Sequence, residues 1–444
     1  MKNEAAKRSA RDLARIVLRR VRSDQAYANL ALSAELKESP NLERVDRGLA
    51  TELIYGVLRH QRFLDHVISQ CLNREIRKTD PFVLDELRLA VYQILMLDRV
   101  PIYAAVDEAV GFLRKVKGEK VAGFANAVLR QIDGQKIEFP SDLIKKMAIQ
   151  NSLPDAIALR WVEQLGFDEA NVLAQEMLKP APFTIRCNGK KVTQENLERI
   201  LIKEGAEVKK GRWSPVALRI YGHPDLFGAP SYEQGLWTVQ DEAAQLVAYA
   251  VDPQPKETIL DACAGVGGKS MHLATMVGDE GRVISVDHNQ QKLVLLKENA
   301  ERLGIRCEVF EADLTDGKVL AGIEAERIVL DAPCSGLGLF RRHPEMKWRR
   351  ETRSIKSLVK LQRDLIQTVL RKLRPGGTFV YSVCTTTEEE GPNQVDWTCS
   401  KFPGMELSPL LEGPVASLLN KGMVTLWPHW HDTDGFFIAR LVSR

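Results

Sequence analysis

The chain has 444 residues, which is too long for a single hydrophobic core, so we expect two or three domains. Its hydrophobic content of 44% is that of an ordinary globular protein, and no run of about 18 apolar residues that could cross a membrane occurs. The net charge of +3 does not by itself indicate a nucleic-acid partner. The 7 cysteines lack the paired spacings of a disulfide framework or a metal site, which favours a reducing cytoplasm and no bound metal.

Residues 1–140 are predicted to form an all-helical domain. In the segment TDPFVLDELRLAVYQILML, apolar residues recur at helical spacing from Leu84 to Leu95. Asp80 is suited to cap the start of this helix, and Pro81 suits its first position. No strand pattern interrupts the domain.

The first predicted helix carries a row of arginines on one face. A guanidinium can grip a phosphate with two hydrogen bonds, so this row favours contact with a nucleic-acid backbone. The alternative is an ordinary solvated helix surface. The arginines are Arg8, Arg11, Arg15, Arg19 and Arg22.

Residues 141–235 are predicted to contain linker helices and then a small α/β domain. The segment EVKKGRW reads as a basic hairpin in which Lys209, Lys210 and Arg212 accompany Trp213. Cations beside an aromatic ring suit single-stranded RNA. A plain exposed turn is the alternative.

Residues 236–444 alternate short apolar runs with helical stretches, a pattern typical of a parallel, doubly wound sheet. Ligands of such sheets bind at the carboxyl ends of the strands. The stretch ILDACAGVGGKSMHLA is a strand, a glycine-rich turn and a helix start. Cys263 stands where a P-loop needs glycine, and Ser270 stands where a dinucleotide fingerprint needs its third glycine, which excludes both motifs.

What remains is a turn whose glycines let a ligand approach bare backbone. Asp287 ends the next strand, where an acid accepts hydrogen bonds from ribose hydroxyls, and Asp313 follows the third, where it can meet an adenine amino group. Helix capping is the alternative for each acid alone. Together they indicate an adenosine ligand without a pyrophosphate, such as S-adenosylmethionine. The loop residues expected to border it are Cys263, Ala264, Gly265, Val266, Gly267, Gly268 and Lys269.

The motifs DACAGVGGKS, DAPCSGLGLFRRHPEMKW, YSVCTTTEEE and DGFF resemble the motif set of RNA cytosine-5 methyltransferases. The N-terminal stretches LIYGVLRHQRFLD and FANAVLR resemble the transcription antitermination factor NusB. The combination is similar to the Fmu/Sun family of small-subunit rRNA methyltransferases over nearly the whole chain. It departs from the usual pattern at Val266, where the family has proline, and at Gly391 and Pro392. The resemblance implies a multidomain chain: an all-α NusB-like domain, a small ferredoxin- or RRM-like α/β domain, and a Rossmann-like methyltransferase domain.

The resemblance also implies roles for two cysteines, each of which follows an apolar run. Cys384 would be the nucleophile that adds to cytosine C6, and Cys334 would assist release; Asp331 would bind the cytosine edge and border the cofactor, and Lys269 would supply positive charge. DNA cytosine methyltransferases use the cysteine of their Pro-Cys motif, so the residues alone do not order the thiols. We expect the two sulfurs on opposite sides of one flipped pyrimidine. Buried structural cysteines are the alternative.

The segment FRRHPEMKWRR after Cys334 concentrates cations beside an aromatic ring. We expect it to grip RNA and stack an extruded base, with a merely basic loop as the alternative. Its residues with such side chains are Arg341, Arg342, His343, Lys347, Trp348, Arg349 and Arg350.

By resemblance, the chain is an S-adenosylmethionine-dependent methyltransferase of a cytosine in 16S rRNA, cytosine 967 in the family pattern, acting through a covalent Cys–C6 adduct. We expect a monomer whose partner is free or partly assembled small-subunit rRNA, with no membrane contact. The alternatives are the same chemistry on transfer RNA and a non-catalytic, NusB-like RNA-binding factor.

Overall fold

The computed structural model describes residues 8–222, 226–316, 319–349 and 355–444. The chain divides into two compact units. We call Met1–Pro180 with Phe340–Arg349 the helical unit, and Ala181–Leu339 with Arg350–Arg444 the sheet unit. None of the described helices combines the length and the apolar character needed to cross a bilayer.

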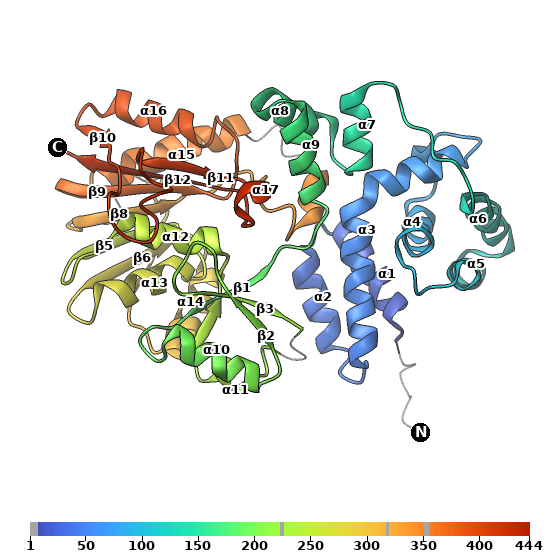
Figure 1. Cartoon of the computed structure of the whole chain (residues 1–444), viewed down its shortest axis with the longest axis horizontal. Helices are drawn as coiled ribbons and strands as arrows, with labels where there is room; N and C mark the ends of the chain where they lie inside the picture. Colours follow the sequence, from blue (N-terminus) through green and yellow to red (C-terminus); the bar gives the residue numbers. More distant parts are fainter. Residues whose placement is uncertain (1–7, 223–225, 317–318, 350–354) are drawn as a thin grey trace. The chain divides into compact units, whose positions relative to one another are not determined.

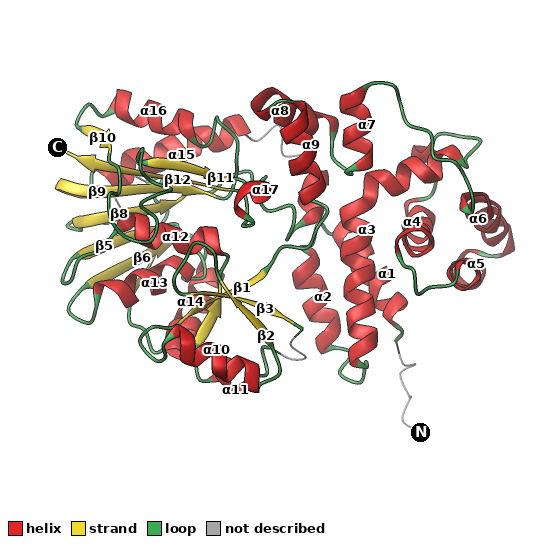
Figure 2. Cartoon of the chain, in the orientation of Figure 1, coloured by secondary structure: helices red, strands yellow, loops and turns green. Residues whose placement is uncertain are grey.

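The first part of the helical unit consists of helices, as the sequence predicts (Figures 1 and 2). Asp80 accepts a hydrogen bond from the Phe82 amide over 2.8 Å, and Pro81 is the first helical residue, which confirms the predicted helix start. The elements are α1 (Ala10–Ser23), α2 (Ala28–Lys37), α3 (Arg44–Gln70), η1 (Ile76–Lys78), α4 (Pro81–Met96), α5 (Ile102–Lys117) and α6 (Glu119–Ile132).

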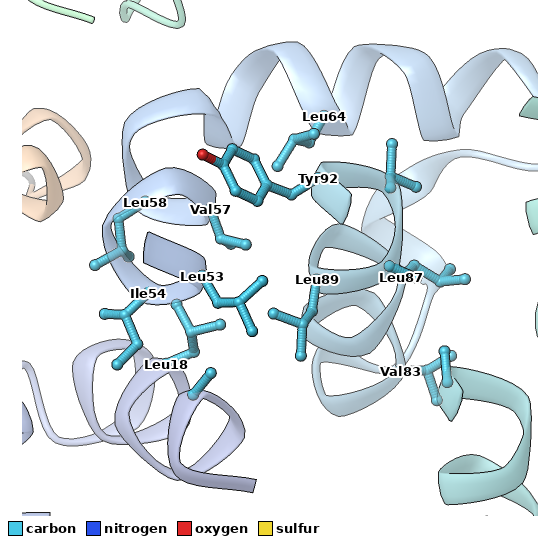
Figure 3. Close-up of a cluster of buried hydrophobic side chains, with 14 of the residues drawn as sticks. Leu18, Leu53, Ile54, Val57, Leu58, Leu64, Val83, Leu87, Leu89 and Tyr92 are labelled. Carbon is cyan, nitrogen blue, oxygen red and sulfur yellow. The ribbon is translucent and has the colours of Figure 1, made fainter. Parts of the chain in front are cut away.

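The core of the helical unit forms where α1, α3 and α4 face one another (Figure 3). Leu18 of α1, Ile54 of α3 and Leu87 of α4 are all at most 5% exposed. A Cβ atom on Gly56 would lie 2.0 Å from the Tyr92 ring. Glycine at this position therefore allows the backbone of α3 to lie close to the Tyr92 ring of α4.

The linker helices that follow residue 140 belong to the helical unit. The Arg62 amide of α3 donates to the Ser152 hydroxyl over 2.7 Å, and the Arg62 guanidinium pairs with Asp155 over 2.7 Å. These contacts attach the linker helices to α3 rather than to the α/β domain that follows. The additional elements are α7 (Leu143–Gln150), α8 (Asp155–Leu165), α9 (Phe167–Glu176) and the short helix η2 (Pro344–Trp348).

The sheet unit begins with a four-stranded antiparallel sheet in the order β2-β3-β1-β4. Ile185, Leu197 and Trp237 form its core and are fully buried. This is the small α/β domain that the sequence predicts. Its elements are β1 (Phe183–Cys187), α10 (Gln194–Lys203), β2 (Glu207–Lys210), β3 (Ala217–Tyr221), α11 (Pro230–Glu233) and β4 (Trp237–Val239).

The second sheet has the order β10-β12-β9-β8-β5-β6-β7, with β11 paired to β12. The β5 to β9 ladders are parallel, so their carboxyl ends share one edge. The C-terminal strand is antiparallel to β9, β10 and β11, so the sheet is mixed rather than wholly parallel. The strands are β5 (Thr258–Ala262), β6 (Arg282–Asp287), β7 (Glu308–Glu311), β8 (Ala325–Asp331), β9 (Leu373–Val383), β10 (Met405–Leu407), β11 (Met423–Leu426) and β12 (Phe436–Ser443).

Helices cover both faces of this sheet. Successive strand residues point to opposite sides, so one strand packs against helices on both faces. Ile259 packs with α12 and α13 on one face, while its neighbour Leu260 packs with α15 on the other. The sheet is therefore buried on both sides, and its strand ends are left to bind a ligand. The helices are α12 (Glu242–Val251), α13 (Gly268–Val277), α14 (Gln290–Leu303), α15 (Ile355–Leu370), α16 (Pro392–Lys401) and α17 (Pro428–His431).

Candidate active site

The glycine-rich loop turns sharply between β5 and α13. Cys263 has a φ of 64°, Gly265 of 58° and Gly267 of 84°, values that L side chains rarely adopt. A Cβ on Gly267 would lie 2.5 Å from the Leu296 side chain, so glycine is required there. The buried carboxylate of Asp287 accepts the Gly265 amide over 2.9 Å and holds the loop against the end of β6.

A cavity of about 180 Å³ adjoins this loop. Asp287 and Asp313, the two acids proposed from the sequence for an adenosine ligand, both line it. Asp313 also accepts hydrogen bonds from the amide and hydroxyl of Thr315, which lower the pKa of its carboxyl. The other lining residues are Cys263, His288, Ala312, Leu314, Thr315, Pro333, Leu361 and Leu365. A bare loop, two acids and apolar walls suit an adenosine group.

Lys269 and Asp331 form an ion pair at the same edge of the sheet. The Lys269 ammonium donates to one Asp331 oxygen over 2.6 Å, and the Ser382 hydroxyl donates to the other over 3.0 Å. Burial opposes the charge on Lys269, but the neighbouring carboxylate of Asp331 outweighs it and raises the pKa of the lysine. Lys269 therefore keeps its positive charge at this edge of the sheet.

The sulfur atoms of Cys334 and Cys384 lie 3.2 Å apart. They meet because β8 and β9 are parallel neighbours in which Asp331 is opposite Ser382, so the two following turns come together. At this distance no ring fits between the sulfurs, and the expectation that they lie on opposite sides of one pyrimidine is wrong.

Its surroundings hold Cys334 as a neutral thiol. Contact with Cys384, burial and the nearby carboxylate of Glu390 together raise the pKa of Cys334 well above its ordinary value. The two sulfurs share a hydrogen bond in which either can be the donor.

Two glycine-containing motifs meet directly behind Cys334. The Gly338 amide donates to the Cys384 carbonyl over 3.2 Å, and the Gly435 amide donates to the Gly338 carbonyl over 2.9 Å. A Cβ on Gly338 would lie 1.9 Å from the Gly435 carbonyl oxygen. The resemblance to the motif segments SGLG and DGFF therefore has a structural basis, because their backbones are in contact.

Sequence reasoning missed two buried charged residues beside the loop. Burial raises the pKa of Asp261 to about 7, although Ser270 donates a hydrogen bond to it. The guanidinium of Arg186, on β1, donates to the Gly268 carbonyl and to Gln240, and burial lowers the pKa of Arg186 to about 9. In both cases, a charged residue within an otherwise apolar strand was the sequence feature that could have identified it.

Most arginines of the row in and just before α1 form ion pairs or hydrogen bonds within the helical unit. Arg15 pairs with Glu86 over 2.8 Å and Arg22 with Asp85 over 2.6 Å, while Arg8 pairs with Glu35 over 2.9 Å. The row thus joins helices to one another at these positions. Arg11 also bonds within the unit, to Gln93, whereas Arg19 is exposed.

The segment after Leu339 belongs to the helical unit, and two of its expected RNA contacts are buried there. Arg341 donates to the Pro180 carbonyl over 3.0 Å, and Lys347 donates to the Arg59 carbonyl over 2.8 Å. Both side chains are less than 5% exposed, so neither presents its charge at the surface. The sequence shows that both residues are cationic, but it does not show that they are buried.

The remaining residues of this segment are less enclosed. Trp348 is half-buried and donates from its indole to the Leu58 carbonyl over 3.4 Å. Arg342 and His343 are also half-buried. Arg350 lies outside the described residues. In the small sheet, Lys209, Lys210 and Arg212 are exposed, with Arg212 over the Trp213 ring.

A glycine turn after the first strand of a Rossmann-like sheet, with acids after the next strands, defines an S-adenosylmethionine-dependent methyltransferase. Residues 248–442 match the family described as 16S rRNA methyltransferase RsmB/F. Residues 8–133 match the NusB family, and residues 153–226 match the ferredoxin-like domain of RsmF/B-like methyltransferases.

Curated relatives match the full length of the chain. A probable ribosomal RNA small subunit methyltransferase B from Bacillus subtilis is 34% identical and covers 99% of both chains. The protein of that name from Pseudomonas syringae pv. tomato is 31% identical over 95% of this chain and 94% of its own. A solved methyltransferase homologue from Pyrococcus horikoshii is 29% identical, with a TM-score of 0.60 over 69% of this chain and 100% of that chain. The chain belongs to the ribosomal RNA small subunit methyltransferase B family.

Proposed function

We propose that the chain methylates carbon 5 of a cytosine in 16S rRNA through a covalent bond between Cys384 and carbon 6. The observation that carries this proposal is the contact between the Cys334 and Cys384 sulfurs beside the Lys269–Asp331 pair. Carbons 5 and 6 are adjacent in the ring, so two touching sulfurs can address both from one side.

Cytosine C5 is a poor nucleophile until a thiolate adds to C6. Addition of the Cys384 thiolate breaks the ring's aromaticity and places electron density on C5, which can then attack a methyl carbon. S-adenosylmethionine, when bound, supplies that electrophilic methyl group. A water molecule then takes the C5 proton, the C6–S bond breaks to release the Cys384 thiolate, and the aromatic ring is restored; Cys334 assists this release by donating a hydrogen bond to the departing sulfur.

Asp331 and Lys269 support the base in this proposal. One Asp331 carboxylate oxygen accepts a hydrogen bond from the cytosine amino group, and the Lys269 ammonium stabilises charge that develops on the ring. Both side chains already hold each other in place, so little reorganisation is needed on binding.

The cofactor is proposed to lie along the glycine-rich loop, in the cavity between Asp287 and Asp313. The backbone from Cys263 to Lys269 would approach it, Asp287 would accept from the ribose and Asp313 from the adenine. The solved NSun6 from Pyrococcus horikoshii, described with SFG, shares the fold at a TM-score of 0.58 and 23% identity.

RNA contact is proposed for exposed or half-buried residues of both units. They are Arg19, Arg342, His343, Trp348, Lys209, Lys210 and Arg212. The buried Arg341 and Lys347 are excluded from this set, and the paired Arg8, Arg11, Arg15 and Arg22 serve first to hold the helices. We propose a cytoplasmic monomer that acts on free or partly assembled small-subunit rRNA.

Bisulfite sequencing of rRNA from cells with and without the gene tests the proposal. We expect one protected cytosine, at position 967 by family resemblance, to become convertible when the gene is deleted. Purified protein should methylate 16S rRNA and leave transfer RNA unmodified. Methylation of transfer RNA alone would favour the first alternative, and RNA binding without any methyl transfer would favour the NusB-like factor.

A further inference from the structure

Glu390 is a fully buried acid whose carboxylate lies among uncharged donors at the ends of β8 and β9. The Ser335 amide donates to one carboxylate oxygen over 2.9 Å, and the Ser335 hydroxyl donates to the other. The Thr387 hydroxyl donates over 3.0 Å and the Gln362 side-chain amide over 3.1 Å. Burying a carboxylate is costly, and hydrogen bonds on both oxygens offset that cost.

These donors come from both cysteine-bearing turns. Ser335 directly follows Cys334, and Thr387 lies three residues after Cys384. Gln362 of α15 also donates to the Pro333 carbonyl over 2.9 Å, which fixes the residue before Cys334. One carboxylate therefore links the turn after β8 to the turn after β9, beside the 3.2 Å contact between the sulfurs.

We propose that Glu390 is a positioning residue of the methyl-transfer site, which clamps the Cys334 and Cys384 turns together and keeps Cys334 from acting as the attacking thiol. The inference rests on the proposed function, to which it adds a residue that acts through the two turns.

The electrostatic surroundings support the second part of this role. The negative charge of Glu390 adds to contact with Cys384 and to burial in raising the pKa of Cys334. Lys269 interacts electrostatically with Cys384. Tyr381 and Asp331 also face the pair; burial and the neighbouring charges raise the pKa of Tyr381, which therefore stays neutral. The negative charge of Glu390 thus acts on Cys334, and the cation Lys269 is a neighbour of Cys384.

Two variants separate the clamp from the charge. Glu390→Gln keeps the length of the side chain and removes its charge, whereas Glu390→Asp keeps the charge but shortens the reach between the turns. Glu257→Gln is the matched control, because Glu257 is a partly buried acid of the same unit that pairs with Arg327 over 2.6 Å at the opposite end of the sheet.

The first measurement is iodoacetamide alkylation of each cysteine against pH, resolved by peptide mass spectrometry in the full-length protein. In the wild type, Cys334 should react slowly at neutral pH, because its pKa is raised. In Glu390→Gln, Cys334 should react about tenfold faster at the same pH, because one cause of its raised pKa is removed. Glu390→Asp and Glu257→Gln should retain the wild-type rate at Cys334. An unchanged Cys334 profile in folded Glu390→Gln would overturn the electrostatic part.

The second measurement is steady-state methylation of 16S rRNA. Glu390→Asp should lower kcat by about 100-fold through misplacement of the thiols, with KM for S-adenosylmethionine unchanged. Wild-type kcat in this variant, or an equal loss in Glu257→Gln, would overturn the clamp. If Glu390→Gln fails to fold, Glu390→Asp still decides the clamp. Alkylation needs no RNA, so a wild type without methylation would refute the proposed function separately.

Discussion

Cys334 and Cys384 are 50 residues apart in the chain, and their sulfurs are in contact at 3.2 Å. The parallel pairing of β8 with β9 places the two turns side by side, and contact with Cys384, burial and Glu390 raise the pKa of Cys334 well above its ordinary value. A thiol held neutral in this way suits an assisting role rather than that of the nucleophile.

Serine substitution at each cysteine should therefore have different effects. Cys384→Ser should abolish both methylation and covalent RNA adducts, because a serine hydroxyl is far less nucleophilic than a thiolate. Cys334→Ser should instead accumulate a covalent adduct, because release fails. Denaturing gel electrophoresis with labelled 16S rRNA distinguishes the two, and an adduct in Cys384→Ser would reverse the assignment.

Loss of the Lys269 charge should slow methyl transfer. In Lys269→Met the Asp331 carboxylate loses its partner at 2.6 Å, and we expect kcat/KM to fall by about 100-fold or more, as for other preorganised charges in active sites. Lys297→Met is the control, because Lys297 is exposed on α14. Equal activity in both variants would show that the Lys269 charge does not act in the reaction.

Gly338→Ala should disrupt the turn that carries Cys334. The added methyl would lie 1.9 Å from the Gly435 carbonyl oxygen, so one backbone must move and separate the two thiols. Activity should fall about 100-fold. Gly123→Ala is the control, since its Cβ meets no atom within 4 Å on α6, where alanine should raise stability by up to about 1 kcal/mol. Thermal unfolding and methylation assays measure both effects.

Asp261 should make the stability of the sheet unit depend on pH. Burial raises its folded pKa from 3.8 to about 7, so within this window the folded state holds a proton that the unfolded state has lost. The free energy of unfolding therefore falls as pH rises from 3.8 to 7 and then levels.

Asp261→Asn cannot titrate, so its advantage over the wild type should grow across that window. At about 1.4 kcal/mol per pKa unit the gain is at most about 4 kcal/mol. Urea unfolding at pH 5 and pH 8 measures it, and parallel pH profiles for the two proteins would refute the assignment of this titration to Asp261.

Two arginines of α1 should differ in what they support. Arg15→Ala leaves the buried Glu86 without its partner and should destabilise the helical unit by about 3 kcal/mol. Arg19 is exposed, so Arg19→Ala should keep stability and lower the salt dependence of RNA binding by about one unit of slope. Thermal unfolding and binding titrations at several salt concentrations separate these outcomes.

The order of the domains could be predicted because it depends on local patterns. Apolar periodicity and the Asp80–Pro81 start predict α4, and strand-helix alternation predicts the second sheet. Such patterns do not report which surfaces pack together. The contact of the linker helices with α3 through Arg62 could not be predicted from such patterns. The burial of Lys347 could not be predicted either, because its charge alone suggests an exposed side chain.

The sequence by itself determined the chemistry available at the site: two cysteines after two strands, a glycine turn, and acids at successive strand ends. Only the tertiary structure decided that the sulfurs touch, that Glu390 connects their turns, and that most of the arginine row of α1 holds helices together. The reason is physical. A residue's type is local, but its charge, acidity and reach depend on burial and on neighbours that folding brings from distant parts of the chain.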